Sequence, residues 1–222
     1  MGSVRNYAKE LDKILAGLPE GKRLLLHSCC APCSSYVMEY LREAFDLTVF
    51  YYNPNITEDV EYRKRVEEQK RLIEAYNRQV ERGDYTGMNS TSKARRIQVI
   101  EGDYEPDCFY AMAKGSEKCP EGGERCFGCY KLRLRKTAQL AAELGFDYFT
   151  TTLTISPLKN AQKLNEIGEA LGEECGVAFL PSDFKKKNGY KRSIELSKQF
   201  ELYRQNYCGC VYSKVAAQER NP

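Results

Sequence analysis

The residues best suited to chemistry are three cysteines that directly follow a short apolar run. The run Leu24–His27 has the character of a buried strand, and Cys29, Cys30 and Cys33 come after it within five residues. The spacing of apolar residues over Tyr36–Ala44 predicts a helix, so the cysteines occupy a strand-to-helix turn. In a parallel α/β sheet such a turn lies where ligands bind, and helix amides there favour anions such as thiolates. The turn is therefore a candidate metal or redox site, although packed core thiols are the plainer alternative.

A second pair, Cys126 and Cys129, has C-x-x-C spacing at the start of a predicted helix. Its sulfurs lie about one turn apart near the positive end of the helix dipole, which favours thiolates. The spacing alone leaves a redox pair, half of a zinc site and half of an iron–sulfur site open. Together with Cys29 and Cys30, the pair offers four thiolates, enough for a closed zinc site or a 4Fe-4S cluster.

Cys208 and Cys210 form a C-x-C pair after a basic, aromatic stretch. This spacing is too tight for easy shared chelation of a metal, but it allows a strained, reducible disulfide. We interpret the two residues as a redox-active pair. Two surface thiols in a turn are the alternative.

The other cysteines and the single histidine are weaker candidates. Cys33, Cys108 and Cys119 are further candidate metal ligands, whereas the apolar surroundings of Cys175 predict a packed thiol. His27 stands at the end of a predicted strand. It is either a hydrogen-bonded core imidazole or a group that supports a metal site or transfers protons.

The elements that must position these residues alternate along the chain. Apolar runs predict five strands, at Leu24–His27, Leu47–Tyr52, Ile97–Ile100, Tyr148–Leu153 and Val177–Leu180. Periodicity and capping residues predict the helices Tyr36–Ala44, Glu58–Tyr76, Pro106–Ala113 and Cys126–Leu144, one that begins at Ser156–Pro157, and Ser193–Arg204.

This alternation predicts an α/β fold: an open parallel sheet of about five strands with helices on both faces. The pattern is compatible with strand order 3-2-1-4-5, whose topological switch point lies between strands one and four. That order would bring the Cys29 turn next to the segment Thr151–Ser156.

The composition of the 222 residues is that of an ordinary globular protein, with 42% hydrophobic and 29% charged residues. No stretch approaches the ~20 apolar residues of a membrane span, and the charged N-terminal segment is unlike a secretory signal. We therefore expect a cytoplasmic protein with no membrane partner. In a reducing compartment, ten cysteines indicate metal or redox chemistry rather than structural disulfides.

The net charge of +3 is small, but the basic residues are clustered. One cluster interleaves positive charge with aromatic residues, as proteins that bind single-stranded RNA do. A solvated basic tail is the alternative. The RNA-binding candidates are Lys185, Lys186, Lys187, Arg192 and Arg204.

Five motifs together resemble the cobalamin-independent epoxyqueuosine reductase family, QueH. They are HSCCAPC at His27–Cys33, YNPNI at Tyr52–Ile56, ERCFGCY at Glu124–Tyr130, TTL at Thr151–Leu153 and YRQNYCGC at Tyr203–Cys210. The resemblance spans nearly the whole chain. It departs from the family pattern in a longer loop at Arg82–Ser92 and in the additional thiols Cys108 and Cys119.

The resemblance implies a single domain over residues 1–222, related to the nucleotide-hydrolase (HUP-like) α/β fold, with a basic helical extension over 183–222. It also implies a 4Fe-4S cluster on Cys29, Cys30, Cys126 and Cys129 and a redox-active pair at Cys208 and Cys210. The implied reaction is the last step of queuosine biosynthesis: epoxyqueuosine at the wobble position of a tRNA with a queuosine-type anticodon is reduced to queuosine.

Such a reaction needs two electrons and two protons, delivered from an electron donor that the sequence does not identify. An additional iron near Cys33 or Asp107 would polarise the epoxide oxygen, and a tyrosine, an aspartate or His27 would protonate it. Two alternatives remain at this stage: a tRNA sulfur-transfer (thiolation) enzyme, and a zinc-stabilised RNA-binding module. The first lacks the phosphate-binding Ser-Gly-Gly-x-Asp-Ser motif after strand one.

Overall fold

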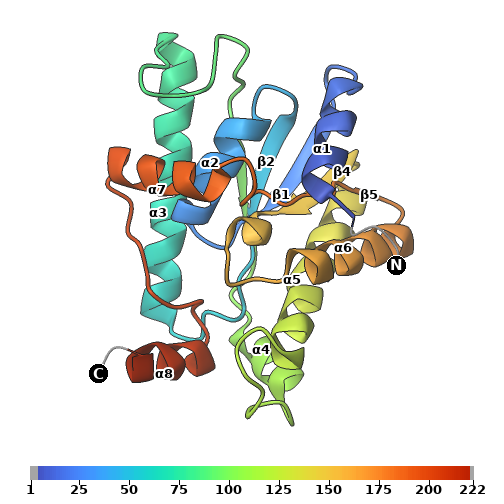
Figure 1. Cartoon of the computed structure of the whole chain (residues 1–222), viewed down its shortest axis with the longest axis vertical. Helices are drawn as coiled ribbons and strands as arrows, with labels where there is room; N and C mark the ends of the chain where they lie inside the picture. The colour runs from blue at the N-terminus through green and yellow to red at the C-terminus, as the bar shows by residue number, and fades with distance from the viewer. Residues whose placement is uncertain (1–4, 221–222) are drawn as a thin grey trace.

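The computed structural model describes residues 5–220, and these are organised around a parallel sheet of five strands. The strands lie side by side in the order β3-β2-β1-β4-β5 (Figure 1). Their bounds are Arg23–His27 for β1, Asp46–Tyr51 for β2, Gln98–Glu101 for β3, Tyr148–Thr151 for β4 and Ala178–Phe179 for β5. The observed order and the parallel pairing confirm the predicted sheet, including its switch point between β1 and β4.

Helices cover both faces of the sheet, as predicted (Figure 1). In chain order they are α1 (Tyr7–Ala16), α2 (Ala31–Leu41), α3 (Asp59–Arg82), α4 (Pro106–Ala113), α5 (Glu124–Glu143), α6 (Ala161–Cys175), α7 (Gly189–Gln199) and α8 (Val211–Arg220). A short 3₁₀ turn, η1 (Thr152–Ile155), follows β4.

Side-chain alternation along β1 divides the interior into two cores. Leu24 and Leu26 pack with residues of α1, α2 and α3, whereas Leu25 packs on the other face with α5 and α6. All three leucines are completely buried, as expected for the central strand of a sheet that is covered on both faces. His27 follows the alternation of Leu25 and therefore points toward α5.

Three predicted helix starts are wrong. α2 begins at Ala31, five residues before the predicted start at Tyr36, so Cys33 lies in its first turn. Ser156 caps the end of η1, and α6 begins five residues later, where the Asn160 side chain accepts a hydrogen bond from the Lys163 amide. The helix predicted at Ser193–Arg204 lies earlier in the chain: α7 begins at Gly189 and ends at Gln199. The sequence patterns also do not predict α1 or α8. The fourth strand is shorter than the predicted Tyr148–Leu153, because β4 ends at Thr151 and η1 begins at Thr152.

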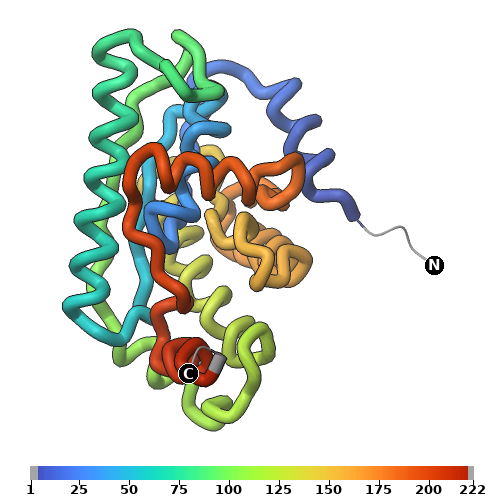
Figure 2. Tube along the Cα trace, turned by 60° about the vertical axis from the view of Figure 1, so that its left-hand side comes forward, coloured from blue at the N-terminus to red at the C-terminus, as the bar shows by residue number. Residues whose placement is uncertain are grey.

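The chain between α7 and α8 is an extended segment that runs along α3 (Figure 2). We call residues 200–208 the C-terminal strap. Arg71 donates to the carbonyl oxygens of Phe200 and Glu201, and the Glu68 carboxylate accepts from the Tyr203 amide at 2.7 Å. The strap therefore brings Cys208 from the α7 side of the molecule to the carboxyl end of the sheet.

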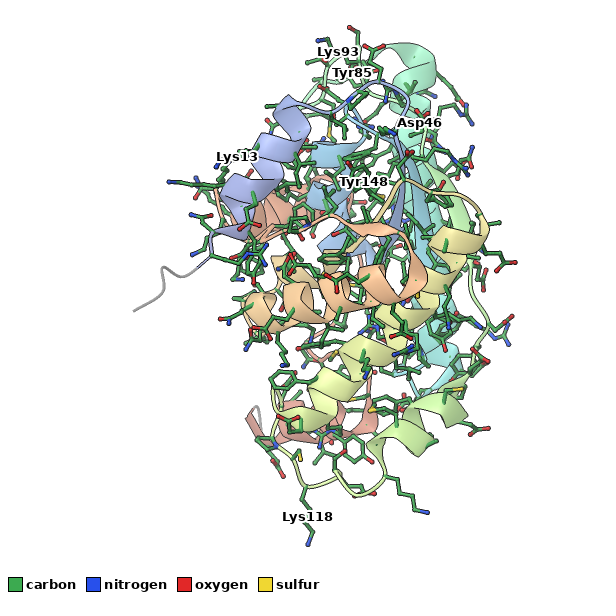
Figure 3. The ribbon with its side chains drawn as sticks, turned by 90° about the vertical axis from the view of Figure 1, so that its right-hand side faces the viewer. Lys13, Asp46, Tyr85, Lys93, Lys118 and Tyr148 are labelled. Atoms are coloured by element: carbon green, nitrogen blue, oxygen red, sulfur yellow. The ribbon has the colours of Figure 1, made fainter. Side chains whose placement is uncertain are left out.

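Two longer connections reach opposite ends of the molecule. Tyr85 and Lys93 lie on the loop after α3 at one end of the molecule, and Lys118 extends from the segment between α4 and α5 at the other end (Figure 3). Within residues 5–220, no helix is both long enough and apolar enough to cross a bilayer.

Candidate thiol-rich active site

Three thiols gather where β1 leads into α2: Cys29 and Cys30 lie in the turn, and Cys33 lies in the first turn of α2. The sulfur atoms of Cys29, Cys30 and Cys33 all lie within 4.8 Å of one another, and those of Cys29 and Cys30 are 3.8 Å apart. Cys30 is the N-cap residue of α2, and the following proline stands in the first helical turn, so the backbone presets this arrangement. Three sulfurs at this separation could hold one metal ion or part of a cluster.

One of these three thiols is more acidic than the other two. Hydrogen bonds from Cys29 and Cys33 hold the pKa of Cys30 well below its ordinary value. The contact with Cys30 raises the pKa of Cys29, and the contacts with Cys29 and Cys30 raise the pKa of Cys33. The amides of the first turn of α2 add a favourable partial charge for a thiolate at its N-cap. Cys30 is therefore the thiol that ionises first.

The Cys29 turn meets the segment after β4, as the predicted strand order requires. The Cys29 amide donates to the Thr152 hydroxyl oxygen at 3.2 Å, and that hydroxyl lies 3.4 Å from the Cys29 sulfur. An outer cavity of about 180 Å³ opens at this junction. Its walls come from the turn, from the η1–α6 loop, from α7 and from the strap, and they include Cys29, Cys30, Cys33, Leu158, Lys159, Tyr190, Arg204 and Cys208.

The remaining candidate thiols surround a smaller inner cavity of about 20 Å³. Cys126 and Cys129 reach it from the first turns of α5, and Cys208 and Cys210 reach it from the residues before α8. Burial raises the pKa of Cys129 to about 12 and also raises the pKa of Cys210. The two cavities share Glu121, Lys159 and Cys208 in their walls, so Cys208 belongs to both groups of thiols.

Arg133 is a buried cation between these thiol groups. Only 1% of the residue is exposed, and its guanidinium donates to the side-chain oxygen of Asn53 and to Nε2 of His27. Burial lowers the pKa of Arg133, but the negative charges of Cys129, Cys208 and Cys29 outweigh burial and keep the pKa above its ordinary value. One positive charge is therefore within electrostatic range of thiols from three segments of the chain.

His27 is held on both sides by the protein. Nδ1 lies 2.8 Å from the Thr151 hydroxyl oxygen, and Nε2 lies 3.1 Å from the Tyr52 carbonyl oxygen and 3.2 Å from Arg133 Nε. Burial, followed by the nearby Arg133 charge, lowers the pKa of His27 to about 3, so the imidazole is neutral at physiological pH. The ring lines neither cavity. This placement favours the core-imidazole interpretation, in which His27 orients Arg133.

Comparison with known proteins identifies the family. Residues 24–216 match the model of the family described as epoxyqueuosine reductase QueH. The chain belongs to the epoxyqueuosine reductase QueH family. It is 44% identical over 190 residues to the epoxyqueuosine reductase QueH of Streptococcus pyogenes serotype M1, covering 86% of this chain and 69% of that protein. The QueH proteins of Staphylococcus epidermidis and Staphylococcus aureus are 42% and 41% identical over 215 residues, which is 95% of this chain and 85% and 84% of theirs.

Membership in the QueH family makes the chain an oxidoreductase and confirms the resemblance seen in its motifs. Among the predicted catalytic residues and metal ligands, four line neither cavity: His27, Asp107, Cys108 and Cys119. Asp107 and Cys108 are exposed on the first turn of α4, and neither lines the outer or the inner cavity. Cys119 is partly buried in the segment before α5, where its carbonyl oxygen accepts from Arg125. Cys175 packs at the edge of the α5–α6 core, as predicted.

Most of the RNA-binding candidates already have partners within the protein. Lys185 pairs with Asp183, Lys187 with Asp12, and Arg192 with the buried Glu39. Arg204 donates to the Ser197 hydroxyl and lines the outer cavity. Within the described residues, Lys186 and Arg204 are the two candidates outside any ion pair.

Sequence reasoning missed the buried groups that support the thiols. Arg133 lies four residues after Cys129 and seven after Cys126, so it shares their helix face, a signal that could have identified it. Lys159 and Tyr130 also line the inner cavity. Lys159 gives little signal in the sequence, because a single lysine in a loop is most often solvated.

Proposed function

We propose that this protein reduces epoxyqueuosine to queuosine at the wobble position of tRNA, using a 4Fe-4S cluster held by Cys29, Cys30, Cys126 and Cys129. The names of its relatives support the reductase activity. The observation that carries the cluster assignment is the buried Arg133 guanidinium, which is within electrostatic range of thiols from both the β1–α2 turn and α5. A cluster with four thiolate ligands carries negative charge, and a buried charge needs a counter-charge.

Two buried phenols strengthen the fit. The hydroxyl groups of Tyr51 and Tyr130 are buried and have no hydrogen-bond partner within the described part of the chain. Tyr130 lines the inner cavity, and the thiols of Cys30 and Cys29 act electrostatically on Tyr51. Unpartnered buried donors cost stability unless a ligand satisfies them, and cluster sulfurs accept hydrogen bonds. The residues present therefore fit an iron–sulfur cluster.

The reaction converts an epoxide into an alkene and consumes two electrons and two protons, with water as the second product. A bound 4Fe-4S cluster supplies single-electron transfer. In this scheme, Cys208 and Cys210 release two electrons and two protons when they close a disulfide, which balances the reaction. Arg133 and Lys159 provide positive charge beside the cysteine sulfurs and so stabilise negative charge on them. The walls of the outer cavity orient the substrate beside Cys208.

Cys33 is available for a further role. It lines the outer cavity beside Cys29 and Cys30 and is not needed for the four cluster ligands. We propose that it contributes to holding the additional iron expected from the sequence. The exposed position of Asp107 on α4 lends no support to the same role for that carboxylate.

The substrate of this proposal is a tRNA with a queuosine-type anticodon. The nucleotide to be reduced lies in a single-stranded loop, so moving it into the outer cavity costs little unstacking free energy. Tyr190 is 37% exposed and Leu158 is 64% exposed, and both lie in the cavity wall, where they could stack on the extruded base. Arg204 supplies a positive charge at the same wall.

The cluster ligands can be tested by measuring iron and sulfide. Protein purified anaerobically should contain iron and acid-labile sulfide in near-equal amounts and show broad visible absorbance. Cys126→Ser or Cys129→Ser should lose most of both, because three thiolates hold the cluster poorly. Cys175→Ser is the matched control and should keep the wild-type content, since Cys175 only packs against the core.

Activity of the same preparations completes this test. The wild type and Cys175→Ser, supplied with a chemical reductant, should convert epoxyqueuosine in tRNA to queuosine, measured by mass spectrometry of the digested nucleosides. Stoichiometric zinc without sulfide would instead support the zinc-stabilised RNA-binding alternative. Sulfur incorporation into the tRNA would support the sulfur-transfer alternative.

A further inference from the structure

Lys159 places a positive charge directly against one sulfur of the C-terminal pair. It lies in the loop between η1 and α6, and its Nζ is 3.3 Å from the Cys208 sulfur. The ammonium also lies 6.0 Å from the ring centre of Tyr130, and the side chain lines both cavities. Burial lowers the pKa of Lys159, but the charge of Cys208 and then that of Tyr130 outweigh burial, so the pKa stays above its ordinary value.

Cys210 has a different environment, although only Gly209 separates it from Cys208. The residue is 8% exposed and lines only the inner cavity. Its sulfur lies 3.3 Å from the Ser213 hydroxyl and 3.4 Å from the Ser213 amide, in the first turn of α8. The pair is therefore asymmetric: one sulfur lies beside an ammonium at the substrate side, and the other is packed against a serine.

We propose that Lys159 sets the direction of the C-terminal redox pair, with Cys208, the sulfur in contact with the ammonium, facing substrate and reductant and Cys210 as its internal partner. This inference rests on the redox role proposed above for the two cysteines. Lys159 acts as a positioning residue, because it works through Cys208.

The chemistry of the pair balances in both directions. In oxidation, the thiols of Cys208 and Cys210 together lose two electrons and two protons and form one S–S bond. The epoxide receives the electrons and the protons, and its oxygen leaves as water. In re-reduction, a thiolate of an external dithiol attacks the Cys208 sulfur, which releases Cys210. The second thiol of the reductant then breaks the mixed disulfide and releases Cys208 as a thiolate beside Lys159.

The other charged or titratable groups around Lys159 do not replace its contact with Cys208. Arg133 acts on it from α5 and opposes its charge, and Tyr130 faces it from the same helix. Glu121, from the segment before α5, lines both cavities together with Lys159. Asn55 contributes an amide 3.9 Å from the Cys208 sulfur, but this group carries no charge. Arg65 from α3 also contacts Cys208, but at its carbonyl oxygen. Within the described residues, removing the Lys159 ammonium therefore removes the cation in contact with the Cys208 sulfur.

Alkylation of the reduced, iron-loaded protein tests this directly. Wild-type protein is treated with iodoacetamide at pH 7, and modification of each cysteine is followed by mass spectrometry, with the exposed Cys108 as internal standard. Cys208 should react faster than Cys210. In Lys159→Met, the Cys208 rate should fall about tenfold, the size expected when a hydrogen bond to a charged group is lost. Lys159→Arg should retain most of the wild-type rate because it keeps the charge.

Lys163→Met is the matched control, since Lys163 is an exposed lysine in the first turn of α6 that pairs with Glu166. It should leave the Cys208 rate unchanged, and all variants should keep wild-type iron. Equal Cys208 rates in Lys159→Met and wild type would overturn the proposal, as would faster alkylation of Cys210 than of Cys208. The alkylation rates require no turnover, so this result is independent of whether the protein reduces epoxyqueuosine.

Discussion

Gly209 is the residue that allows the two C-terminal cysteines to face the same cavity. Its φ angle is +118°, which side-chain-bearing residues rarely adopt. A Cβ atom at this position would also lie 2.7 Å from Cγ1 of the buried Ile56. Both the backbone and the packing therefore require glycine between Cys208 and Cys210.

We predict that Gly209→Ala will displace the pair. The melting temperature should fall, because the backbone must shift to relieve strain of about 1 to 3 kcal/mol. The rate at which the reduced protein forms the Cys208–Cys210 disulfide on oxidation should drop for the same reason. Disulfide formation can be followed by thiol titration.

Gly115→Ala is the matched control for this experiment. Gly115 also has a positive φ angle, +83°, but a Cβ atom there would have no neighbour within 4 Å. It should show the backbone cost alone and leave disulfide formation unchanged. If both variants behave identically, the contact with Ile56 is irrelevant to the pair.

At the residue scale, the sequence could predict the thiols but not their partners. Cysteines carry chemistry that is visible from type and spacing, so Cys29, Cys30, Cys126 and Cys129 are easy to single out. The partnership of His27 with Arg133 joins residues 106 positions apart and depends on where α5 crosses the sheet. No local pattern reports such a contact.

At the scale of elements, α3 acts as the support for the C-terminal strap. Side chains at helical spacing on one face of α3, namely Glu61, Lys64, Arg65, Glu68 and Arg71, all contact strap residues. Arg65, itself buried, donates to the carbonyl oxygen of Cys208 at 3.2 Å. The position of Cys208 is thus fixed by a helix that contributes no thiol.

We predict that Glu68→Ala will loosen the strap. Glu68 accepts from the Tyr203 amide and pairs with Arg71, so its removal leaves both donors without this carboxylate. Hydrogen exchange at the Tyr203 amide should become about tenfold faster, in line with the loss of a hydrogen bond to a charged group. Exchange measured by mass spectrometry on strap peptides reports this change.

Glu67→Ala provides the comparison, because the neighbouring Glu67 side chain is 73% exposed and pairs only with Lys70 on its own helix. Strap exchange should stay at the wild-type rate in this variant. Similar acceleration in both variants would show that loss of charge on α3, rather than the Tyr203 contact, controls the strap.

The strands were easier to predict than the helices near the C-terminus. Central strands are buried on both faces, so continuous apolar runs such as Leu24–Leu26 identify them. The start of α6 was misplaced because Ser156–Pro157 has the preferences of a helix start, whereas the chain first completes η1. The first part of the strap, as far as Arg204, was predicted as helix because its residues suit either state. Its contacts with α3 decide between the two, and these are not local in sequence.

At the scale of the whole molecule, positive charge is divided between structural pairs and free positions. Arg192 and Glu39 form an ion pair with side-chain exposures of 17% and 2%, which joins α7 to α2. Lys186 is exposed and has no ion-pair partner in the described chain. A cluster that looks uniform in sequence therefore contains residues with different functions.

We predict that Lys186→Ala and Arg192→Ala will affect different measurements. Lys186→Ala should lower the slope of log affinity for tRNA against log salt by about 0.7, the value for one phosphate contact with a single strand. Arg192→Ala should instead lower the free energy of unfolding by about 3 kcal/mol, because it leaves Glu39 buried without its cation. Filter binding at several salt concentrations and denaturant unfolding measure the two effects.

Lys93→Ala serves as the control for tRNA binding, since Lys93 lies in the loop after α3 near one end of the molecule (Figure 3). It should change neither the slope nor the stability. A salt slope unaffected by Lys186→Ala would assign Lys186 to solvated surface rather than to the tRNA interface.

The path of the strap also orders events during protein synthesis. The sheet, the Cys29 turn and the N-terminus of α5 all precede the strap in the chain, so they leave the ribosome before Cys208 and Cys210 do. Until the strap lies on α3, the outer cavity lacks the wall formed by residues 204–208. A nascent chain therefore exposes Cys29, Cys30, Cys126 and Cys129 while the side later closed by the strap is still open, which is the interval in which the proposed cluster has its widest access to them.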